Sequence, residues 1–493
     1  MKSMSRFKAL ALTAVSLSSL AQTARAETLM DALVKAYRSN PTLTGARASQ
    51  RGVDEDVAIA KADGRPSASI SGSYNEQIAR TPQLVSTGVD FVSIQTTPPR
   101  NVTGQGSLNV PIYSGGTVRN AVNAAKLRVE SGQNNLRGTE SSIFSQVVGA
   151  YMDVIRDSQI VLLNAQNVGA LEVNLRASRD RFEVGDLTRT DVAQSDSRLA
   201  LARASYQRAQ AQLISSKESY TALVGTPPDT LETPPGLPGL PDTPEVAVSV
   251  ALSDNPDIRA AQKARDAARY DVKSAQGAVL PRLSAFTNGS YTDYLNTENN
   301  LIVGPYNKSA QAGATLTVPL YQGGRPGANQ RQAVARESAA IEQSIQAERG
   351  VIAQVRSAYA IWKAALLNIE STRTAASAAD LSLEGVKAEN SVGTRTVLDI
   401  LNAEQEQLNA RVQLVTAERD AYVAAFTLIA AMGHAEARDL GLDPTALYDP
   451  NDNYKRVRNK LFDFDFASKP GAASTSTRDT RSQTATPITV PAN

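Results

Sequence analysis

The sequence of 493 residues contains no cysteine, one histidine (His434) and one tryptophan (Trp362). Zinc fingers, thiol nucleophiles, disulfide frameworks, two-histidine metal sites and iron–sulfur clusters all need residues that this chain lacks. A Ser-His-Asp triad could use only His434, which follows Gly433 and is best interpreted as a residue at a helix terminus. No Gly-Lys dipeptide occurs, which excludes a Walker A loop. We therefore expect neither an enzyme nor a bound cofactor.

The first 26 residues have the order of a secretory signal peptide. Basic residues at positions 2, 6 and 8 precede an apolar stretch over 9–21, and residues 24–26 (Ala-Arg-Ala) supply a small-x-small cleavage site. Removing this segment takes away four of the 51 basic residues and none of the 49 acidic ones, which leaves 47 and 49 and a net charge of −2. We therefore expect an exported, slightly acidic protein with no nucleic-acid partner.

Features that would anchor the exported chain to a membrane are few. Beyond the signal there is no run of about 18 apolar residues, so a spanning helix is excluded and any membrane crossing requires strands. Without cysteine, the mature N-terminus cannot carry a lipid on that residue. The basic cluster of Lys455, Arg456, Arg458 and Lys460 is interpreted as a solvated or headgroup-facing patch.

The chain consists of two similar halves. Residues 110–117 (Val-Pro-Ile-Tyr-Ser-Gly-Gly-Thr) recur as residues 318–325 (Val-Pro-Leu-Tyr-Gln-Gly-Gly-Arg), 208 positions later. Self-similarity at a fixed spacing indicates repeated structural units. We therefore predict a first repeat over 27–225, a Pro- and Gly-rich linker over 226–245, a second repeat over 246–440, and a C-terminal segment over 441–493 with a disordered tail.

Each repeat is expected to contain a long pair of antiparallel helices. No proline occurs from residue 112 to 226 or from 327 to 443, and proline breaks helix interiors. Within these stretches apolar residues recur every seven positions, as in Val147, Val154 and Val161, which indicates coiled-coil packing. The rows change phase at Val-Gly pairs, where glycine suits a helix end. We predict coiled-coil hairpins over about 116–225 and 325–433.

Shorter helices are expected to extend the returning arm of each hairpin. Residues 117–184 would span roughly 100 Å, whereas the returning residues 187–224 would span only about 57 Å. Asn-Pro pairs begin helical segments of suitable length at 41–64 and 256–279. We predict that each of these segments stacks end to end with a returning helix.

Strands are predicted next to the helices. Apolar or small residues alternate with polar ones over 103–113 and 310–320, and their partners give hairpins over about 66–113 and 281–321. A soluble half-buried hairpin shows the same period as a transmembrane barrel strand. An exported chain with no other anchor favours the barrel. Four strands cannot close one, because about eight are the usual minimum, so the chain must form an oligomer.

The order strand, strand and long helical hairpin, present twice, resembles the TolC-like outer-membrane efflux protein family over roughly residues 28–445. The most specific stretch is residues 391–401 (Ser-Val-Gly-Thr-Arg-Thr-Val-Leu-Asp-Ile-Leu). The resemblance implies a mainly α fold with β, in which a homotrimer forms a twelve-stranded barrel in outer-membrane lipid, continued by an α-helical barrel in the periplasm. It also implies a type I secretion or multidrug export channel that works with a periplasmic adaptor and an inner-membrane ABC, RND or MFS transporter.

The candidate functional residues Asp191, Arg395 and Asp399 follow the hairpin turns. An acid near a helix N-terminus is explained by capping and by the helix dipole as readily as by a function. The resemblance implies that Asp191 and Arg395 belong to a network between neighbouring hairpins that keeps the periplasmic entrance closed, and that Asp399 belongs to an acidic ring there. Asn390 and Asn402 depart from the family pattern, which predicts weaker cation selectivity.

The turns themselves, Val184 with Gly185 and Val392 with Gly393, are the predicted contacts for an adaptor, because exposed loops are where partners bind. The sequence also allows an interpretation from another functional class. A soluble periplasmic coiled-coil scaffold or adaptor protein would have the same hairpins, with its strands packed in a small domain away from lipid.

Overall fold

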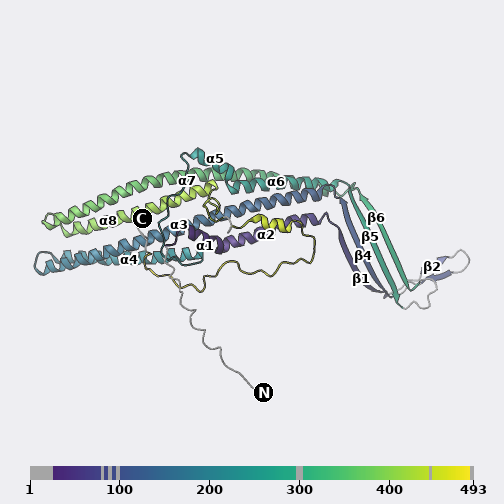
Figure 1. Cartoon of the computed structure of the whole chain (residues 1–493), viewed down its shortest axis with the longest axis horizontal. Helices are drawn as coiled ribbons and strands as arrows, with labels where there is room; N and C mark the ends of the chain where they lie inside the picture. Colours follow the sequence, from purple (N-terminus) through teal and green to yellow (C-terminus); the bar gives the residue numbers. More distant parts are fainter. Residues whose placement is uncertain are drawn as a thin grey trace, which may run out of the picture.

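The computed structural model describes residues 26–78, 83–86, 92–95, 100–295, 304–443 and 447–488, so that the predicted signal peptide, apart from residue 26, lies outside the described residues. Figure 1 shows a long molecule with a sheet at one end and the tips of two helical hairpins at the other. The predicted mainly α fold, with two long strands and a long helical hairpin in each half, is confirmed.

Helices make up most of the described chain. They are α1 (Leu29–Ser39), α2 (Pro41–Ala62), α3 (Thr117–Glu183), α4 (Arg189–Val224), α5 (Pro244–Asp254), α6 (Pro256–Gln276) with the short 3₁₀ helix η1 (Gly277–Val279), α7 (Arg325–Ser391), α8 (Val397–Met432) and α9 (Pro450–Val457). The strands are β1 (Ser67–Glu76), β2 (Gln83–Ser86), β3 (Val92–Gln95), β4 (Arg100–Tyr113), β5 (Arg282–Leu295) and β6 (Tyr306–Thr317). None of the helices in the described ranges is long and apolar enough to cross a membrane.

The four long strands form one antiparallel sheet in the order β1-β4-β5-β6. Alternation places apolar side chains such as Ile70 and Leu108 on one face. The other face carries hydroxyl groups that bond across strands, including Ser69 with Ser107 at 2.7 Å and Ser290 with Ser309 at 2.7 Å. Within the described chain, β1 and β6 each pair on one side only. The sheet is therefore amphipathic and open at both edges.

The last strand differs from its predicted bounds. The alternation predicts a strand over 310–320, whereas β6 begins at Tyr306 and ends at Thr317. The partner strand β5 begins at Arg282, which lies opposite Thr317, so the ladder has no pair beyond this residue.

A pair of glycines connects the last strand of each half to the long helix that follows it. Gly115 and Gly116 have φ values of 63° and 79°, and Gly323 and Gly324 have φ values of 61° and 78°. Side chains are disfavoured at such positive φ values, so both junctions need two glycines in succession. This requirement explains the Gly-Gly that ends the repeated sequence phrase.

Two asparagines join the short helices to the returning helices. Asn40 caps α2, and its side-chain amide donates to the carbonyl of Leu223 at the end of α4, at 3.0 Å. Asn255 caps α6 and donates to the carbonyl of Ala431 at the end of α8, at 2.9 Å. The structure therefore has the predicted end-to-end stacking of α2 with α4 and of α6 with α8. The Asn-Pro pair supplies both the cap and a first helical residue that needs no N–H partner.

The largest apolar core lies midway along the molecule, where α1, α3, α4 and α8 meet. Tyr151 is fully buried there, and its hydroxyl lies 2.8 Å from the carbonyl of Glu27 and 2.6 Å from that of Glu232. The Tyr220 hydroxyl donates to the Glu27 carboxylate at 2.9 Å. The core thus ties both the start of the described chain and the interrepeat linker to the α3–α4 hairpin.

The end of the described C-terminal tail makes specific contacts with the helices, while disorder of the tail as a whole remains a prediction. Its Ser-, Thr- and Pro-rich composition predicts disorder, but its last described residues lie against α3 and α4. The Lys217 ammonium donates to the carbonyls of Thr484 at 3.1 Å and Thr486 at 2.6 Å, and the Ile488 amide donates to the Ser158 hydroxyl at 3.3 Å. Hydrogen bonds from buried polar groups hold this segment, and composition alone does not reveal them.

Candidate functional site at the hairpin tips

Both hairpin tips have the same local construction. Gly185 and Gly393 adopt φ values of 83° and 84° at the turns, and a capping box then starts the returning helix. The Asp191 carboxylate accepts from the amide of Thr188 at 2.9 Å and from its hydroxyl at 2.7 Å. The Asp399 carboxylate accepts from the Thr396 amide and hydroxyl at 2.9 and 2.8 Å. Both aspartates therefore have a structural role as caps.

The same hydrogen bonds keep the two carboxylates ionised. The Thr188 hydroxyl, and then its amide, holds the pKa of Asp191 below the ordinary value of an aspartate. The pKa of Asp399 is also lowered, first by the Thr396 amide, then by the Thr396 hydroxyl and more weakly by the nearby Arg395 charge. Each tip therefore carries a negative charge at neutral pH.

Arg395 has partners within its own hairpin. Its guanidinium forms an ion pair with Glu389, with Nε 2.7 Å from Oε2, and this pair raises the pKa of Arg395. The Asn390 side-chain amide donates to the Arg395 carbonyl at 2.7 Å and so closes the turn. Among the described residues of this single chain there is no contact between Asp191 and Arg395. The predicted network between neighbouring hairpins remains a prediction.

The two hairpins of one chain do meet behind the tips, through an apolar cluster. Leu401 of α8 is only 2% exposed and packs with Leu171 and Leu175 of α3 and with Leu199 and Ala202 of α4. Leu401 thus crosses from the second hairpin into the core of the first. We call this group of five residues the tip cluster.

A buried carboxylate lies beside the tip cluster. Glu404 of α8 is 4% exposed, and its Oε2 accepts from the Asn174 amide of α3 at 2.8 Å. Lys387 of α7 lies 3.2 Å from Oε1, near enough for an ion pair though not aligned for a hydrogen bond. Close by, Arg198 of α4 donates to the Asn402 side chain at 2.8 Å. Polar contacts therefore reinforce the apolar contact between the hairpins.

Sequence reasoning did not single out Glu404, although a signal was present. Glu404 lies three residues after Leu401 and four before Leu408, and both leucines belong to one seven-residue row. Residues at these spacings share a helix face, so periodicity places the carboxylate on the buried side. A charge on a buried face needs a partner, and this requirement could have marked the position.

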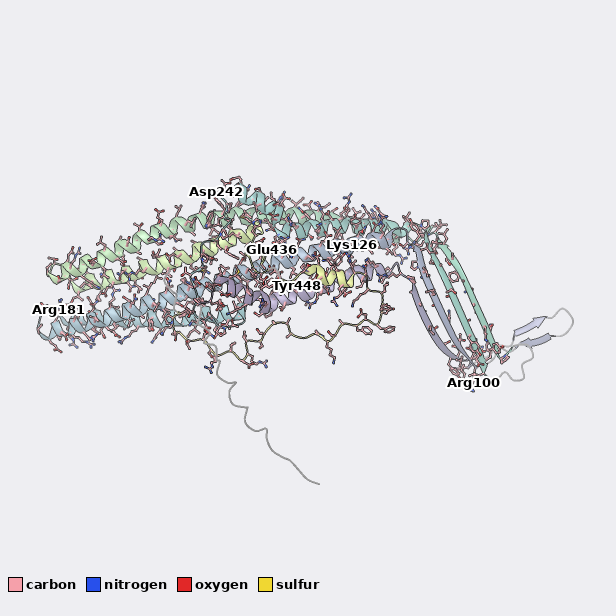
Figure 2. The ribbon with its side chains drawn as sticks, in the orientation of Figure 1. Arg100, Lys126, Arg181, Asp242, Glu436 and Tyr448 are labelled. Carbon is pink, nitrogen blue, oxygen red and sulfur yellow. The ribbon has the colours of Figure 1, made fainter. Side chains whose placement is uncertain are left out.

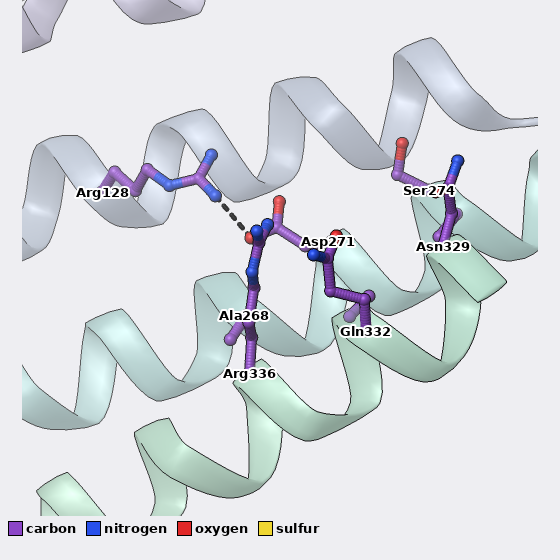
Figure 3. Close-up of a pocket in the computed structure, with 9 residues that line it drawn as sticks. Arg128, Ala268, Asp271, Ser274, Asn329, Gln332 and Arg336 are labelled. Atoms are coloured by element: carbon purple, nitrogen blue, oxygen red, sulfur yellow. Dashed lines mark hydrogen bonds and ion pairs between the residues drawn. The ribbon is translucent and has the colours of Figure 1, made fainter.

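A polar pocket of about 380 Å³ lies far from the tips, between α3, α6 and α7 (Figure 3). Arg128 of α3 and Asp271 of α6 form an ion pair across it, and Arg336 of α7 also lines it. The ion pair thus connects α3, the long helix of the first half, with α6, a short helix of the second half. Figure 2 shows the opposite end of the helices at Arg181, close to the first tip, so the pocket and the tip residues form separate groups.

The chain is similar to known proteins over most of its length. The family model described as outer membrane efflux protein matches residues 32–226 and 247–434. The Brucella suis outer membrane efflux protein BepC is 37% identical over 442 residues, covering 90% of this chain and 92% of its own. The Escherichia coli outer membrane protein TolC is 27% identical over 462 residues and covers 89% of each chain. The Campylobacter jejuni CmeC outer membrane channel superposes with a TM-score of 0.71 at 17% identity, over 87% of this chain and 89% of its own.

The two matched segments contain one helical hairpin each, and the relatives that cover nearly the full length are named as outer-membrane proteins. A soluble periplasmic scaffold is therefore set aside. The chain belongs to the outer membrane efflux protein family, as an exit duct of the outer membrane whose helices form a long extension into the periplasm.

Proposed function

We propose that three copies of the chain form one passive conduit, which exports proteins or small toxic molecules received from an inner-membrane transporter through a periplasmic adaptor. The observation that carries this proposal is the amphipathic sheet with two open edges. Its apolar face suits lipid and its hydroxyl-bearing face suits a water-filled lumen. An open edge presents unpaired N–H and C=O groups, and pairing with a neighbouring copy satisfies them.

The hairpin tips are the proposed contact for the adaptor. Val184 and Val392 are large apolar residues exposed at the turns, each beside a glycine in a left-handed conformation. The turns between α3 and α4 and between α7 and α8 lie at the end of the molecule opposite the sheet (Figure 1). With the sheet in the outer membrane, this end would face an inner-membrane partner.

A cysteine introduced at the tip tests this contact. Because the chain has no cysteine, Val392→Cys gives a single attachment point for a photoactivatable crosslinker. We expect it to capture a periplasmic adaptor in cells, whereas Leu367→Cys, an exposed position midway along α7, should capture much less. Equal capture at both positions, or recovery of the protein in the osmotic-shock supernatant instead of the outer membrane, would overturn the proposal.

The tip charges are proposed to act between neighbouring copies, with Asp191 and Arg395 contributing to closure. For Arg395→Ser we expect a severalfold higher conductance in planar bilayers, because the change removes the cation that would bridge adjacent hairpins. Arg189→Ser removes an exposed arginine from the other tip and is the matched control. Wild-type conductance in Arg395→Ser would refute a latch at this residue.

Asp399 is proposed to form an acidic ring at the entrance. Asp399→Asn keeps an acceptor for the Thr396 hydrogen bonds and removes the charge, so we expect a clearly weaker cation preference in reversal-potential measurements. Because the pKa of Asp399 is lowered, its charge is present above that pKa and is lost as the pH falls through it. The wild-type preference should therefore persist to lower pH than an ordinary aspartate allows. An unchanged reversal potential in the variant would exclude the ring.

A further inference from the structure

The segment that begins in the last turn of α9 and continues beyond it combines basic and aromatic residues in a way that the conduit does not require. It runs over residues 455–466, and we call it the basic-aromatic segment. Its first half contains Lys455, Arg456, Arg458 and Lys460, and its second half contains Leu461, Phe462, Phe464 and Phe466.

Hydrogen bonds hold this segment at the level where the helices end and the sheet begins. The Lys61 ammonium, near the end of α2, donates to the Arg458 carbonyl at 2.8 Å and to the Asn459 side chain at 2.8 Å. The Arg65 guanidinium donates to the Lys460 carbonyl at 2.6 Å. Arg65 lies two residues before the first residue of β1, so the segment is fixed beside the start of the sheet.

The apolar side chains of the segment are exposed to an unusual degree. Leu461, Phe462, Phe464 and Phe466 have exposed fractions between 69% and 87%. Phe464 and Phe466 contact each other edge to face, with ring centroids 6.4 Å apart. Aromatic side chains gathered in one exposed place indicate a surface that something apolar covers.

Basic residues outnumber acidic ones in the basic-aromatic segment. The acids of the segment are Asp463 and Asp465, and Asp465 pairs with Lys460 at 2.6 Å. Within the described part of the chain, neither Arg456 nor Arg458 forms an ion pair with a carboxylate. Burial lowers the pKa of Lys61, and the neighbouring charges of Lys126, Arg65 and Arg458 lower it further. Positive charge therefore predominates around Lys61, beside the first half of the segment.

The end of the sheet beside this segment also carries exposed aromatic and apolar side chains. Tyr113 and Tyr321, the tyrosines of the two repeated phrases, are both exposed there, as is Leu320. In proteins that cross the outer membrane with strands, aromatic residues gather where the apolar band meets the headgroups. The basic-aromatic segment therefore lies at the depth of the periplasmic headgroup layer.

We propose that the basic-aromatic segment is a second membrane contact, in which Arg456 and Arg458 bind anionic phospholipid headgroups of the periplasmic leaflet while Leu461 and the three phenylalanines enter the boundary of the acyl chains. The charge of the segment is complementary to such lipids, and its apolar side chains are large enough to reach below the headgroups. This proposal depends on the outer-membrane location of the chain and not on the gating of the tips.

A spin label can measure the depth of the segment. In the full-length protein reconstituted in bilayers that contain phosphatidylglycerol, we label Phe464→Cys and compare its accessibility to oxygen and to a water-soluble nickel chelate. Ile70→Cys on the apolar face of β1 is the lipid reference, and Leu367→Cys on α7 is the water reference. We expect the label at 464 to resemble that at 70. Accessibility like that at 367, or low accessibility to both reagents, would overturn the proposal, the latter by showing that protein covers the segment.

The charge requirement has its own test. Arg456→Gln with Arg458→Gln should weaken the association of the segment with phosphatidylglycerol bilayers by about fivefold for each arginine and so raise nickel accessibility at position 464. Arg179→Gln with Arg203→Gln removes the same charge from the hairpins and should have no effect. If nickel accessibility in the unmodified background is the same in phosphatidylcholine alone as with phosphatidylglycerol, anionic phospholipid is not the partner.

Discussion

Leu401→Ala is expected to open the periplasmic end of the conduit. The leucine belongs to α8 but is buried among residues of α3 and α4, so it contributes to the contact between the two hairpins and not only to the core of its own hairpin. Replacing a buried leucine by alanine removes apolar contact and leaves a cavity, at a cost of about 2–5 kcal/mol. Much of that loss falls on the contact between the hairpins, because the tip cluster connects them.

A loss of free energy of this size is large enough to shift the equilibrium between the closed and open forms of the tips. If the resting conduit is mostly closed, each loss of about 1.4 kcal/mol shifts the ratio of open to closed forms tenfold. We therefore expect Leu401→Ala to raise the resting conductance in planar bilayers at least tenfold. Spin labels at Val184→Cys and Val392→Cys should report a greater distance between the tips of one chain.

The matched control is Leu213→Ala. Leu213 is fully buried in the central core, so the same substitution should lower thermal stability without moving the tips. If Leu401→Ala lowers the melting temperature as Leu213→Ala does but leaves the conductance and the tip distance unchanged, the tip cluster contributes to packing alone.

The sequence predicts the long helices well because their causes are local. The stretch without proline and the seven-residue rows predict a helix over 117–184, and α3 covers Thr117–Glu183. The Asn-Pro pairs predict the starts of α2 and α6, since a cap and a first-turn proline act within a few residues. The repeated Gly-Gly and Val-Gly pairs also mark real turns, where positive φ values need glycine.

Contacts between distant segments are harder to predict. The packing of Ile488 on α3, and the bonds of Lys217 to the tail carbonyls, depend on where the chain returns after more than two hundred residues. The role of Glu404 depends in the same way on Asn174, which lies 230 positions away. Periodicity shows that Glu404 is buried, but it does not show which side chain is opposite.

The tip residues illustrate both cases. That Asp191 and Asp399 cap their helices follows from Thr-x-x-Asp at the start of each helix, which is a local pattern. The Glu389 partner of Arg395 is six residues away, across the turn, and depends on the geometry of that turn. A network between neighbouring copies depends on surfaces that one sequence does not define.

Glu404→Ala is expected to loosen the tips by a different route. The carboxylate accepts a hydrogen bond from Asn174 and lies beside Lys387, so its removal leaves a half-buried amide without its acceptor. A fully buried unsatisfied group costs about 1–3 kcal/mol, so the loss here falls toward the low end of that range. Breaking a fully buried ion pair would cost about 3–5 kcal/mol, but the Lys387 side chain is half exposed and its ammonium can turn to water. We therefore expect a rise in conductance that is clear but smaller than that of Leu401→Ala.

Two further variants separate hydrogen bonding from charge. Glu404→Gln keeps an oxygen acceptor for Asn174 and loses only the charge next to Lys387, so its conductance should lie between those of the wild type and Glu404→Ala. Glu406→Ala removes an exposed carboxylate from the same helix and should leave the conductance unchanged. A lower conductance in Glu404→Ala would mean that the cost of burying the carboxylate exceeds the benefit of its contacts. Glu404 would then favour the open form and would not contribute to closure.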